Sequence, residues 1–375
     1  MPAPRSSWAR KRNNDQGKKA ESHIIQGEHM AEKYFFLGSY AKTGMGLHTC
    51  ALDDKTGAIR LICGSDVGPN PSYLAISSDH SRLYVANESD GTVTGCRISH
   101  PDEPVEVLGA QPCHGRGPCY VSLDRSRSWL FVANYSSGSI AVYPTGPDGA
   151  PGEAVSTVQH SGSGPNPKRQ EGPHAHCIVV SPDNKFVYVA DLGLDRIVAY
   201  AFDEKNGAIM PHLETLTAPG AGPRHVAWSP DGHYLFCAME LDSTVAAYSY
   251  TSTTGGLKLI GTVPTLPAGF AGSSSCAAIR VHPNGKFLYV SNRGHDSIAV
   301  FSIDPAIGMI ESRAHVDAAG RVPRDFNLDP NGRFMIVAHQ DDDTAVAFRV
   351  SDETGIPARL DGDPVRVPAP VCVVF

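Results

Sequence analysis

Eight side chains of this chain have the chemistry of a site for an anionic ligand. Arginine presents planar, paired N–H donors that fit carboxylates and phosphates and polarise a carbonyl group. Histidine exchanges a proton near neutral pH, and a glutamate among arginines stays ionised. The set comprises His174, His176, Asp191, Arg224, His225, Glu240, Arg293 and Arg324.

We predict two roles within this set. Taken singly, each residue is more often a solvated or ion-paired surface side chain, so the prediction depends on their convergence at one place. The predicted catalytic residues are His176 as a base, Glu240 as an ionised partner that orients it, and Arg224 as an anion and carbonyl ligand. The predicted substrate-binding residues are Arg293, Arg324, His174, Asp191 and His225.

An internal repeat indicates how the chain brings these residues together. From Pro71 the chain reads as an apolar run, a turn, a second apolar run, another turn and an alternating run, and this frame returns five more times. The last residue of the second run recurs at spacings of 47, 57, 48, 53 and 47. This is the period of a β-propeller whose blades are slightly longer than WD repeats. These marker residues are Asn87, Asn134, Asp191, Met239, Asn292 and His339.

The two ends of the chain are predicted to complete the ring as a seventh blade. Each unit supplies three strands, and a variable segment such as PVEVLGAQ or LKLIGTV supplies the fourth. The C-terminal run VCVVF is expected as the innermost strand of the last blade, with YFFLGSY, GLHTCALD and AIRLICG as the other three. The predicted fold is therefore an all-β, seven-bladed β-propeller over residues 31–375, closed by N- and C-terminal strands in one blade. An eight-bladed ring and an open sandwich are the alternatives; seven blades use every residue from 34 to 375.

Two positions in each blade are predicted to face the central funnel on the same side of the ring. They are the residue that opens the first strand and the residue just past the marker. The loop before the third unit adds Arg169, Gln170 and His174. The first positions are Ser72, Cys119, His176, Arg224, Ala277 and Arg324, and the second are Glu88, Tyr135, Leu192, Glu240, Arg293 and Gln340.

Charge and cysteine content limit the partners and the compartment. A net charge of −7 and a pI near 6.1 argue against nucleic acid and anionic membranes as partners. The nine cysteines are scattered and form no CxxC pair, which favours reduced thiols in a cytoplasmic protein. Residues 1–30 are basic and lack the apolar core of a signal peptide, so we predict a disordered extension there.

No metal or other cofactor is predicted. The run from Asp341 to Asp343 falls in a turn without a calcium-loop pattern, and a solvated turn is the favoured interpretation. His174 and His176 are two residues apart and would point to opposite faces of a strand, which argues against a paired zinc site.

The motifs around these residues resemble the lactonase family of seven-bladed β-propellers. The matching stretches are RQEGPHAH, VSPDNKFVYVADLGLDRI, GAGPRHVAWSPDG, SNRG and PRDFNLDPNG, and the resemblance runs from about residue 34 to residue 375. That family includes propeller-type 6-phosphogluconolactonases and carboxy-cis,cis-muconate lactonizing enzymes. Carried over by motif, the resemblance implies site roles for His176, Arg224 and Glu240, with Arg293 as a looser match. His174 belongs to the family's PHxH pattern and Asp191 to its DLG motif.

The resemblance implies an enzyme that acts on a small anionic lactone. We favour metal-independent hydrolysis of a sugar lactone such as 6-phosphogluconolactone, in which an arginine polarises the carbonyl and either His176 or Glu240 activates water. The muconate cycloisomerase reaction is the alternative within the family. A non-catalytic interaction propeller and a metal-dependent lactonase propeller are the alternatives outside it. A monomer or weak homodimer is expected, because a closed propeller satisfies its own sheet edges.

Overall fold

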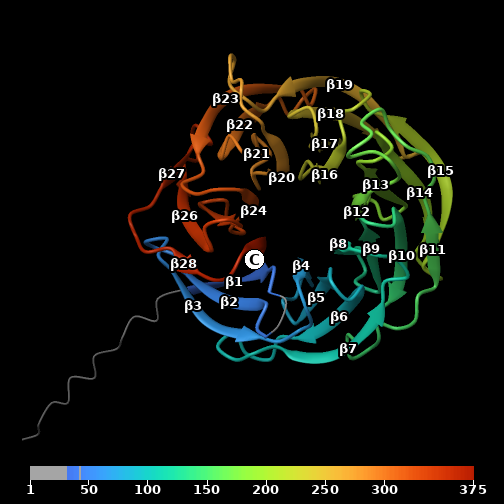
Figure 1. Ribbon diagram of the computed structural model, residues 1–375, viewed down its shortest axis with the longest axis horizontal. Coiled ribbons are helices and arrows are strands. Elements are labelled where there is room, and N and C mark those ends of the chain that lie inside the picture. Colours follow the sequence, from blue (N-terminus) through green and yellow to red (C-terminus); the bar gives the residue numbers. More distant parts are fainter. Residues whose placement is uncertain (1–31, 42–43) are drawn as a thin grey trace, which may run out of the picture. The chain divides into compact units, whose positions relative to one another are not determined.

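The seven-bladed ring predicted from the repeat is confirmed by the computed structural model, which describes residues 32–41 and 44–375. The described residues form seven sheets arranged in a ring (Figure 1). The innermost strands of all seven sheets line a central cavity, which is called the channel below. The extension predicted over residues 1–30 lies outside the described residues. Within them, no helix is long and apolar enough to cross a membrane.

Each blade is an antiparallel sheet whose first strand lines the channel. We number the blades in chain order and give each from its innermost to its outermost strand. Blades 1 to 3 are β4 (Pro71–Ile76), β5 (Arg82–Asn87), β6 (Thr92–Arg97) and β7 (Glu106–Pro112); β8 (Pro118–Leu123), β9 (Trp129–Asn134), β10 (Ser139–Pro144) and β11 (Ser156–Gln159); and β12 (Ala175–Val180), β13 (Phe186–Asp191), β14 (Arg196–Asp203) and β15 (Ala208–Leu216). Blades 4 to 6 are β16 (Pro223–Trp228), β17 (Tyr234–Met239), β18 (Thr244–Thr251) and β19 (Gly256–Pro264); β20 (Ser275–Val281), β21 (Phe287–Arg293), β22 (Ser297–Ile303) and β23 (Ile310–Asp317); and β24 (Pro323–Leu328), β25 (Phe334–His339) and β26 (Thr344–Val350), which pairs with both β27 (Pro357–Arg359) and β28 (Val365–Arg366).

The two ends of the propeller chain meet in blade 7, as the sequence predicted. Its innermost strand is β29 (Pro370–Val374), followed by β1 (Glu32–Ser39), β2 (Leu47–Asp53) and β3 (Ile59–Ser65). β29 pairs with β1 in antiparallel register, with Leu37 opposite Val373. This pairing satisfies the sheet edges that an open ring would expose.

Turn glycines determine how closely neighbouring blades approach. Gly207 and Gly355 each sit in the turn after the third strand of a blade, with φ of 69° and 71°. A Cβ at Gly207 would collide with the ring of Trp129, and one at Gly355 with the ring of Phe287, in the preceding blade. The positive φ and the close ring both require glycine, so the repeated turn also sets the spacing of the blades.

A β-bulge at the start of every innermost strand orients the residues that face the channel. In β16, Pro223 is opposite Met239 and His225 is opposite Ala238, which leaves Arg224 as the extra residue. The other blades shift register at the same place. A bulge redirects side chains and interrupts the strict alternation of faces. The extra residues in five of these strands are Ser72, Cys119, His176, Arg224 and Arg324.

All nine cysteines are unpaired within the described part of the chain. Eight of them are buried, and Cys63 is half-buried.

Candidate functional site

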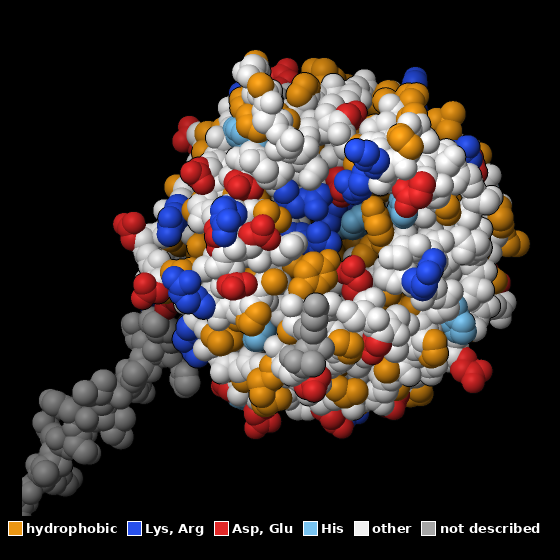
Figure 2. All heavy atoms as spheres, in the orientation of Figure 1, with side chains coloured by type: hydrophobic (Ala, Val, Ile, Leu, Met, Phe, Trp, Pro, Cys, Tyr) orange, Lys and Arg blue, Asp and Glu red, His pale blue; other side chains and the backbone are white. Residues whose placement is uncertain are grey.

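Charged side chains converge at one mouth of the central channel. Figure 2 shows a group of Lys or Arg side chains in the hollow at the centre of one face, with histidine beside it. Four arginines lie at the end of the channel where the innermost strands begin: two at the bulged starts of β16 and β24, one at the end of β21 and one in the loop before β12. This end of the channel is called the upper mouth below.

Glu240, directly after β17, is held by three arginines. Its Oε2 lies 2.9 Å from Nε of Arg224 and 3.0 Å from Nη2 of Arg293, and its Oε1 accepts a hydrogen bond from Arg169 at 2.5 Å. The Arg224 contact is an ion pair without hydrogen-bond alignment, because Arg224 Nε has no partner of suitable geometry. Arg224 and Glu240 are only 2% and 3% exposed. We call Glu240 with these three arginines the Glu240 cluster.

The cluster fixes the charge of its members. Burial by itself raises the pKa of Glu240, but the charges of Arg293 and Arg224 outweigh it, and the carboxyl pKa falls below its ordinary value. Burial and the neighbouring Arg293 lower the pKa of Arg224 to about 10, so this side chain remains a cation at neutral pH. Glu240 is therefore a carboxylate whose oxygens are already occupied, which makes it a poor proton acceptor.

His176 lies beside this cluster as a neutral imidazole. Burial, and then the positive charge of Arg224, hold its pKa well below the ordinary value. Its Nδ1 is 3.8 Å from Sγ of Cys119. Its Nε2 forms no hydrogen bond with any residue that the structure describes, so it is available to a water molecule or a substrate.

The loop before β12 closes one side of the mouth. His174 stacks on Tyr135 with ring centroids 4.5 Å apart, and its Nδ1 lies 2.9 Å from the Tyr135 carbonyl oxygen. Tyr135 also meets His176 edge to face at 5.3 Å, and its hydroxyl accepts a hydrogen bond from Arg169 at 3.4 Å. The sequence placed Arg169 and Tyr135 near the funnel but gave them no role; the structure brings both into contact with predicted site residues.

Below the cluster, His225 and two tyrosine rings pack against one another in the channel. The two consecutive residues Arg224 and His225 contact each other, with Arg224 Nη1 3.2 Å from His225 Nε2. His225 meets Tyr73 and Tyr120 edge to face at 5.5 and 5.1 Å, and these two tyrosines stack at 4.0 Å. His225 therefore separates the cluster from the aromatic layer, and burial holds its pKa well below the ordinary value.

Asp191 is a predicted substrate-binding residue that the structure places apart from the arginines. It is fully buried; its Oδ2 lies 2.6 Å from His160 Nδ1, and its Oδ1 accepts hydrogen bonds from the backbone N–H groups of His174 and Gly193. The markers Asn87 and Asn134 fasten their own blades in a similar way, each donating from Nδ2 to a carbonyl of the preceding loop. The contacts of Asp191 thus position the loop that carries His174.

A second group occupies the opposite half of the upper mouth. Arg324 Nη2 donates a hydrogen bond to the Tyr40 hydroxyl at 2.7 Å, and that hydroxyl donates to Glu88 Oε2 at 2.9 Å. The Arg324 guanidinium also lies over the Tyr40 ring, 5.2 Å from its centroid. Tyr40 is not among the site residues predicted from the sequence. It follows β1, the second strand of blade 7, so the repeat frame extended to that blade would have found it at the position just past the marker.

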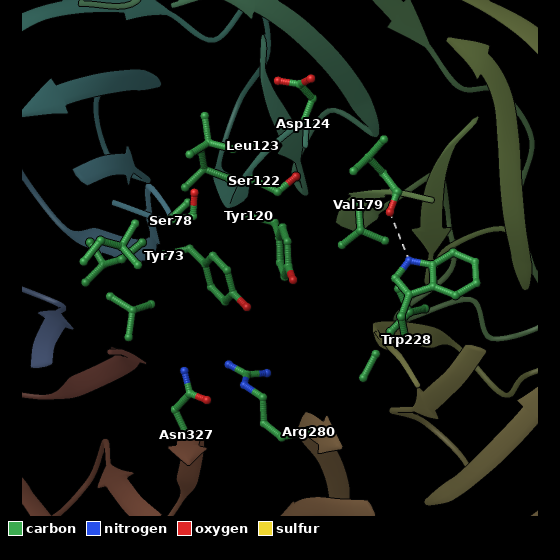
Figure 3. A pocket seen from close by; sticks show the side chains of 18 of the residues that line it. Tyr73, Ser78, Tyr120, Ser122, Leu123, Asp124, Val179, Trp228, Arg280 and Asn327 are labelled. Carbon is green, nitrogen blue, oxygen red and sulfur yellow. Dashed lines mark hydrogen bonds between the residues drawn. The ribbon is translucent and has the colours of Figure 1, made fainter. Parts of the chain in front are cut away.

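The lower end of the channel has a different character. A cavity of about 690 Å³ opens there, lined among others by Tyr73, Tyr120, Trp228 and Arg280. Figure 3 shows the Arg280 guanidinium facing the two tyrosines. Arg280 Nη2 donates to Asp325 Oδ1 at 2.9 Å, so the charge of this arginine is compensated by a buried carboxylate.

Two of the aspartates in the turn from Asp341 to Asp343 accept hydrogen bonds from protein groups. No three His, Cys, Asp or Glu side chains of the described residues come together as a metal-binding group. Asp342 accepts hydrogen bonds from Arg321 Nε and the Arg321 backbone N–H, and Asp343 accepts one from the backbone of Ala369.

Comparison with known proteins agrees with this architecture. Residues 34–375 match the family model described as lactonase, 7-bladed beta-propeller. The chain is 35% identical over 343 residues to the 6-phosphogluconolactonase of Bacillus subtilis (strain 168), covering 91% of this chain and 97% of that protein. Among solved structures, a putative 6-phosphogluconolactonase from Bacteroides fragilis superposes with a TM-score of 0.85 at 30% identity, covering 92% of this chain and 98% of that one. The periplasmic gluconolactonase of Pseudomonas aeruginosa superposes with a TM-score of 0.87 at 29% identity, covering 92% and 99%. The chain therefore belongs to the lactonase family of seven-bladed β-propellers.

Proposed function

We propose that this protein hydrolyses the lactone of a sugar acid, 6-phosphogluconolactone, to the open-chain acid without a metal ion. The observation that carries the proposal is a neutral, buried His176 beside arginines that Glu240 holds in place. The proposed substrate is a small anionic lactone, and the reaction involves no nucleic acid, membrane or protein partner.

The arrangement supports different roles for the imidazole and for the arginines. Arg224 and Arg293 are fixed cations in a largely buried site, and such preorganised positive charge stabilises the oxyanion that forms when water attacks a carbonyl. His176 Nε2 is free to take a proton from that water. Glu240 holds the arginines rather than accepting the proton, because its oxygens are already occupied.

The proposed reaction proceeds through a tetrahedral intermediate. A water oxygen bonds to the lactone carbonyl carbon while His176 takes one water proton. The bond between that carbon and the ring oxygen then breaks, and the ring oxygen takes the proton back from His176. The product is first a carboxylic acid next to Arg224, and it becomes the carboxylate when the second proton of the attacking water passes to the solvent. An anionic substrate also offsets the arginine charge that lowers the pKa of His176, which makes the imidazole a better base once the substrate is bound.

The relatives support this choice of substrate class. The Bacillus subtilis protein is named a 6-phosphogluconolactonase, and the Pseudomonas aeruginosa structure is described as a gluconolactonase. Both names refer to lactones of a six-carbon sugar acid.

The test is turnover by the purified protein in a pH-stat, with 6-phosphogluconolactone, gluconolactone and muconate lactones as substrates. We expect hydrolysis of the phosphorylated lactone well above its spontaneous rate. Turnover confined to the muconate series would assign the cycloisomerase reaction instead. No acceleration of any lactone would contradict the proposal and favour a binding role.

A further inference from the structure

The upper mouth is divided between two halves of the ring. His176 and the Glu240 cluster come from blades 3, 4 and 5 and from the loop before blade 3. Arg324, Tyr40 and Glu88 come from blades 6, 7 and 1, which are consecutive around the ring. A ligand in the mouth therefore faces two different sets of side chains.

Arg324 differs from the other arginines of the mouth because no carboxylate of the described residues contacts it. Arg169, Arg224 and Arg293 each contact Glu240, whereas no carboxylate lies within 4 Å of Arg324 in residues 32–41 and 44–375. A guanidinium has five N–H donors, and within the same residues Arg324 uses one of them, toward Tyr40. A half-buried arginine with an open fork of donors is suited to a phosphate or carboxylate.

Tyr40 and Glu88 fix the orientation of this arginine. Because the Tyr40 hydroxyl donates its hydrogen bond to Glu88, its oxygen lone pair is free to accept a hydrogen bond from Arg324. The Tyr40 ring supports the guanidinium from one side. The Glu88 carboxylate lies behind the Tyr40 hydroxyl rather than on the guanidinium itself, so it holds Arg324 through Tyr40 without occupying the open donors.

Arg324 also lies within electrostatic range of the reacting groups. Its charge contributes to the lowered pKa values of Arg224 and His176, and it takes the same bulge position at the start of β24 that Arg224 and His176 take in β16 and β12. A lactone whose carbonyl lies beside His176 would extend its other end toward Arg324.

We infer that Arg324, held by Tyr40, binds the phosphate of the substrate and sets the preference for phosphorylated over unphosphorylated sugar acids. This inference rests on the proposed function for the nature of the ligand. It adds a separate anion subsite, remote from the reacting carbonyl, and gives Tyr40 a positioning role.

Calorimetric titration with 6-phosphogluconate and with gluconate tests the inference by binding alone. We expect the wild-type protein to bind the phosphorylated acid at least about 10-fold more tightly, the range of a charge-assisted hydrogen bond. Arg324→Met should weaken binding of 6-phosphogluconate by about 10- to 100-fold and abolish the preference. Tyr40→Phe, which keeps the ring but removes the hydroxyl, should reduce the preference by a smaller factor.

The matched control is Arg321→Met, three residues earlier in the chain. Arg321 is exposed, with 68% of its side chain accessible, and pairs with Asp342 outside the mouth. This variant should keep the wild-type preference. Equal binding of the two acids by the wild type, or an equal loss for both acids in Arg324→Met, would overturn the inference. The proposed function is tested separately, by hydrolysis of the lactones by the wild-type protein in the pH-stat. Failure of the subsite and failure of the proposed function can therefore be distinguished.

Discussion

The two ends of the central channel contain arginines in different electrostatic settings. At the upper mouth three arginines share the single carboxylate of Glu240, and Arg324 has no carboxylate within 4 Å among the described residues. At the lower end Arg280 pairs with Asp325, one carboxylate for one cation. The excess positive charge at the upper mouth has to be balanced by a ligand or solvent, whereas the lower pair is internally balanced. Arginine content alone therefore does not identify a site; the stoichiometry of arginines and carboxylates does.

The lower pair has a structural role instead. Asp325 Oδ2 accepts a hydrogen bond from the backbone N–H of Val373 at 2.9 Å, and its Oδ1 accepts from Arg280. One carboxylate thus joins blades 5 and 6 to the closing strand β29. The comparison predicts that substitutions at the upper mouth affect turnover and those at the lower end affect folding.

The largest effect is expected from His176→Gln. Loss of the proposed base should lower kcat on 6-phosphogluconolactone by about 10²- to 10⁴-fold, the usual contribution of general base catalysis. His212→Gln, on the exposed outer strand β15, serves as the control and should retain wild-type kcat. Unchanged turnover in His176→Gln would remove the imidazole from the mechanism.

Arg224→Met should have the next largest effect. It removes a fixed cation from the Glu240 cluster, and kcat is expected to fall by about 10²- to 10³-fold. Trp228→Phe, which alters the lower cavity, provides the comparison in the same assay and should leave turnover within about twofold of wild type. Equal losses in the two variants would show that the channel acts as a whole and that the division between its ends is wrong.

Arg280→Met at the lower end of the channel should affect stability rather than turnover. It leaves the buried Asp325 without its cation, at a cost of about 3 kcal/mol in the free energy of unfolding. Denaturant unfolding measures this loss, while kcat per folded molecule should stay at the wild-type value. A fall in kcat without a fall in the free energy of unfolding would contradict the structural role of the Arg280–Asp325 pair.

Acid should destabilise the protein through the histidines at the centre of the channel. His176 and His225 have folded-state pKa values well below 6.5, so the unfolded chain binds protons first as the pH falls through 6.5. Their contribution to stability is present above that pH and is lost below it. Burial raises the pKa of Asp325, so protonation of this carboxyl group has the opposite effect and stabilises the fold as the pH falls. This effect appears only as the pH approaches the pKa of that carboxyl group.

Calorimetric Tm values between pH 7 and pH 5 measure this dependence. We expect Tm to fall by several degrees over the interval in the wild type, and the slope to be smaller in His225→Gln. An identical slope in that variant would mean that other groups cause the acid sensitivity.

The smallest effect is expected from a chelator. The oxygens of Glu240 are occupied by arginines, and Glu88 accepts from Tyr40, so neither carboxylate is free to hold a cation in this arrangement. Adding EDTA should leave both kcat and Tm unchanged. Loss of activity on chelation, restored by a divalent cation, would support the metal-dependent alternative.

The fold and the position of the site could be predicted from the sequence because the repeat is local. The apolar runs and turn residues of each blade determine its strands, and the marker spacing determines how many blades close the ring. Repetition of one frame is also why His176, Arg224, Glu240, Arg293 and Arg324 could be assigned to the same mouth from their positions in the repeat alone.

Contacts between blades could not be read from that frame, since they join residues far apart in the sequence. Only the tertiary structure brings Arg169 onto Glu240, places Tyr40 between Arg324 and Glu88, and assigns Asp191 to its own loop. Protonation states follow from the same packing: burial and neighbouring charges, which the sequence does not specify, keep His176 neutral and Glu240 ionised. The repeat therefore locates the site, whereas the packing of the blades sets which side chains pair and which donors are open to a ligand.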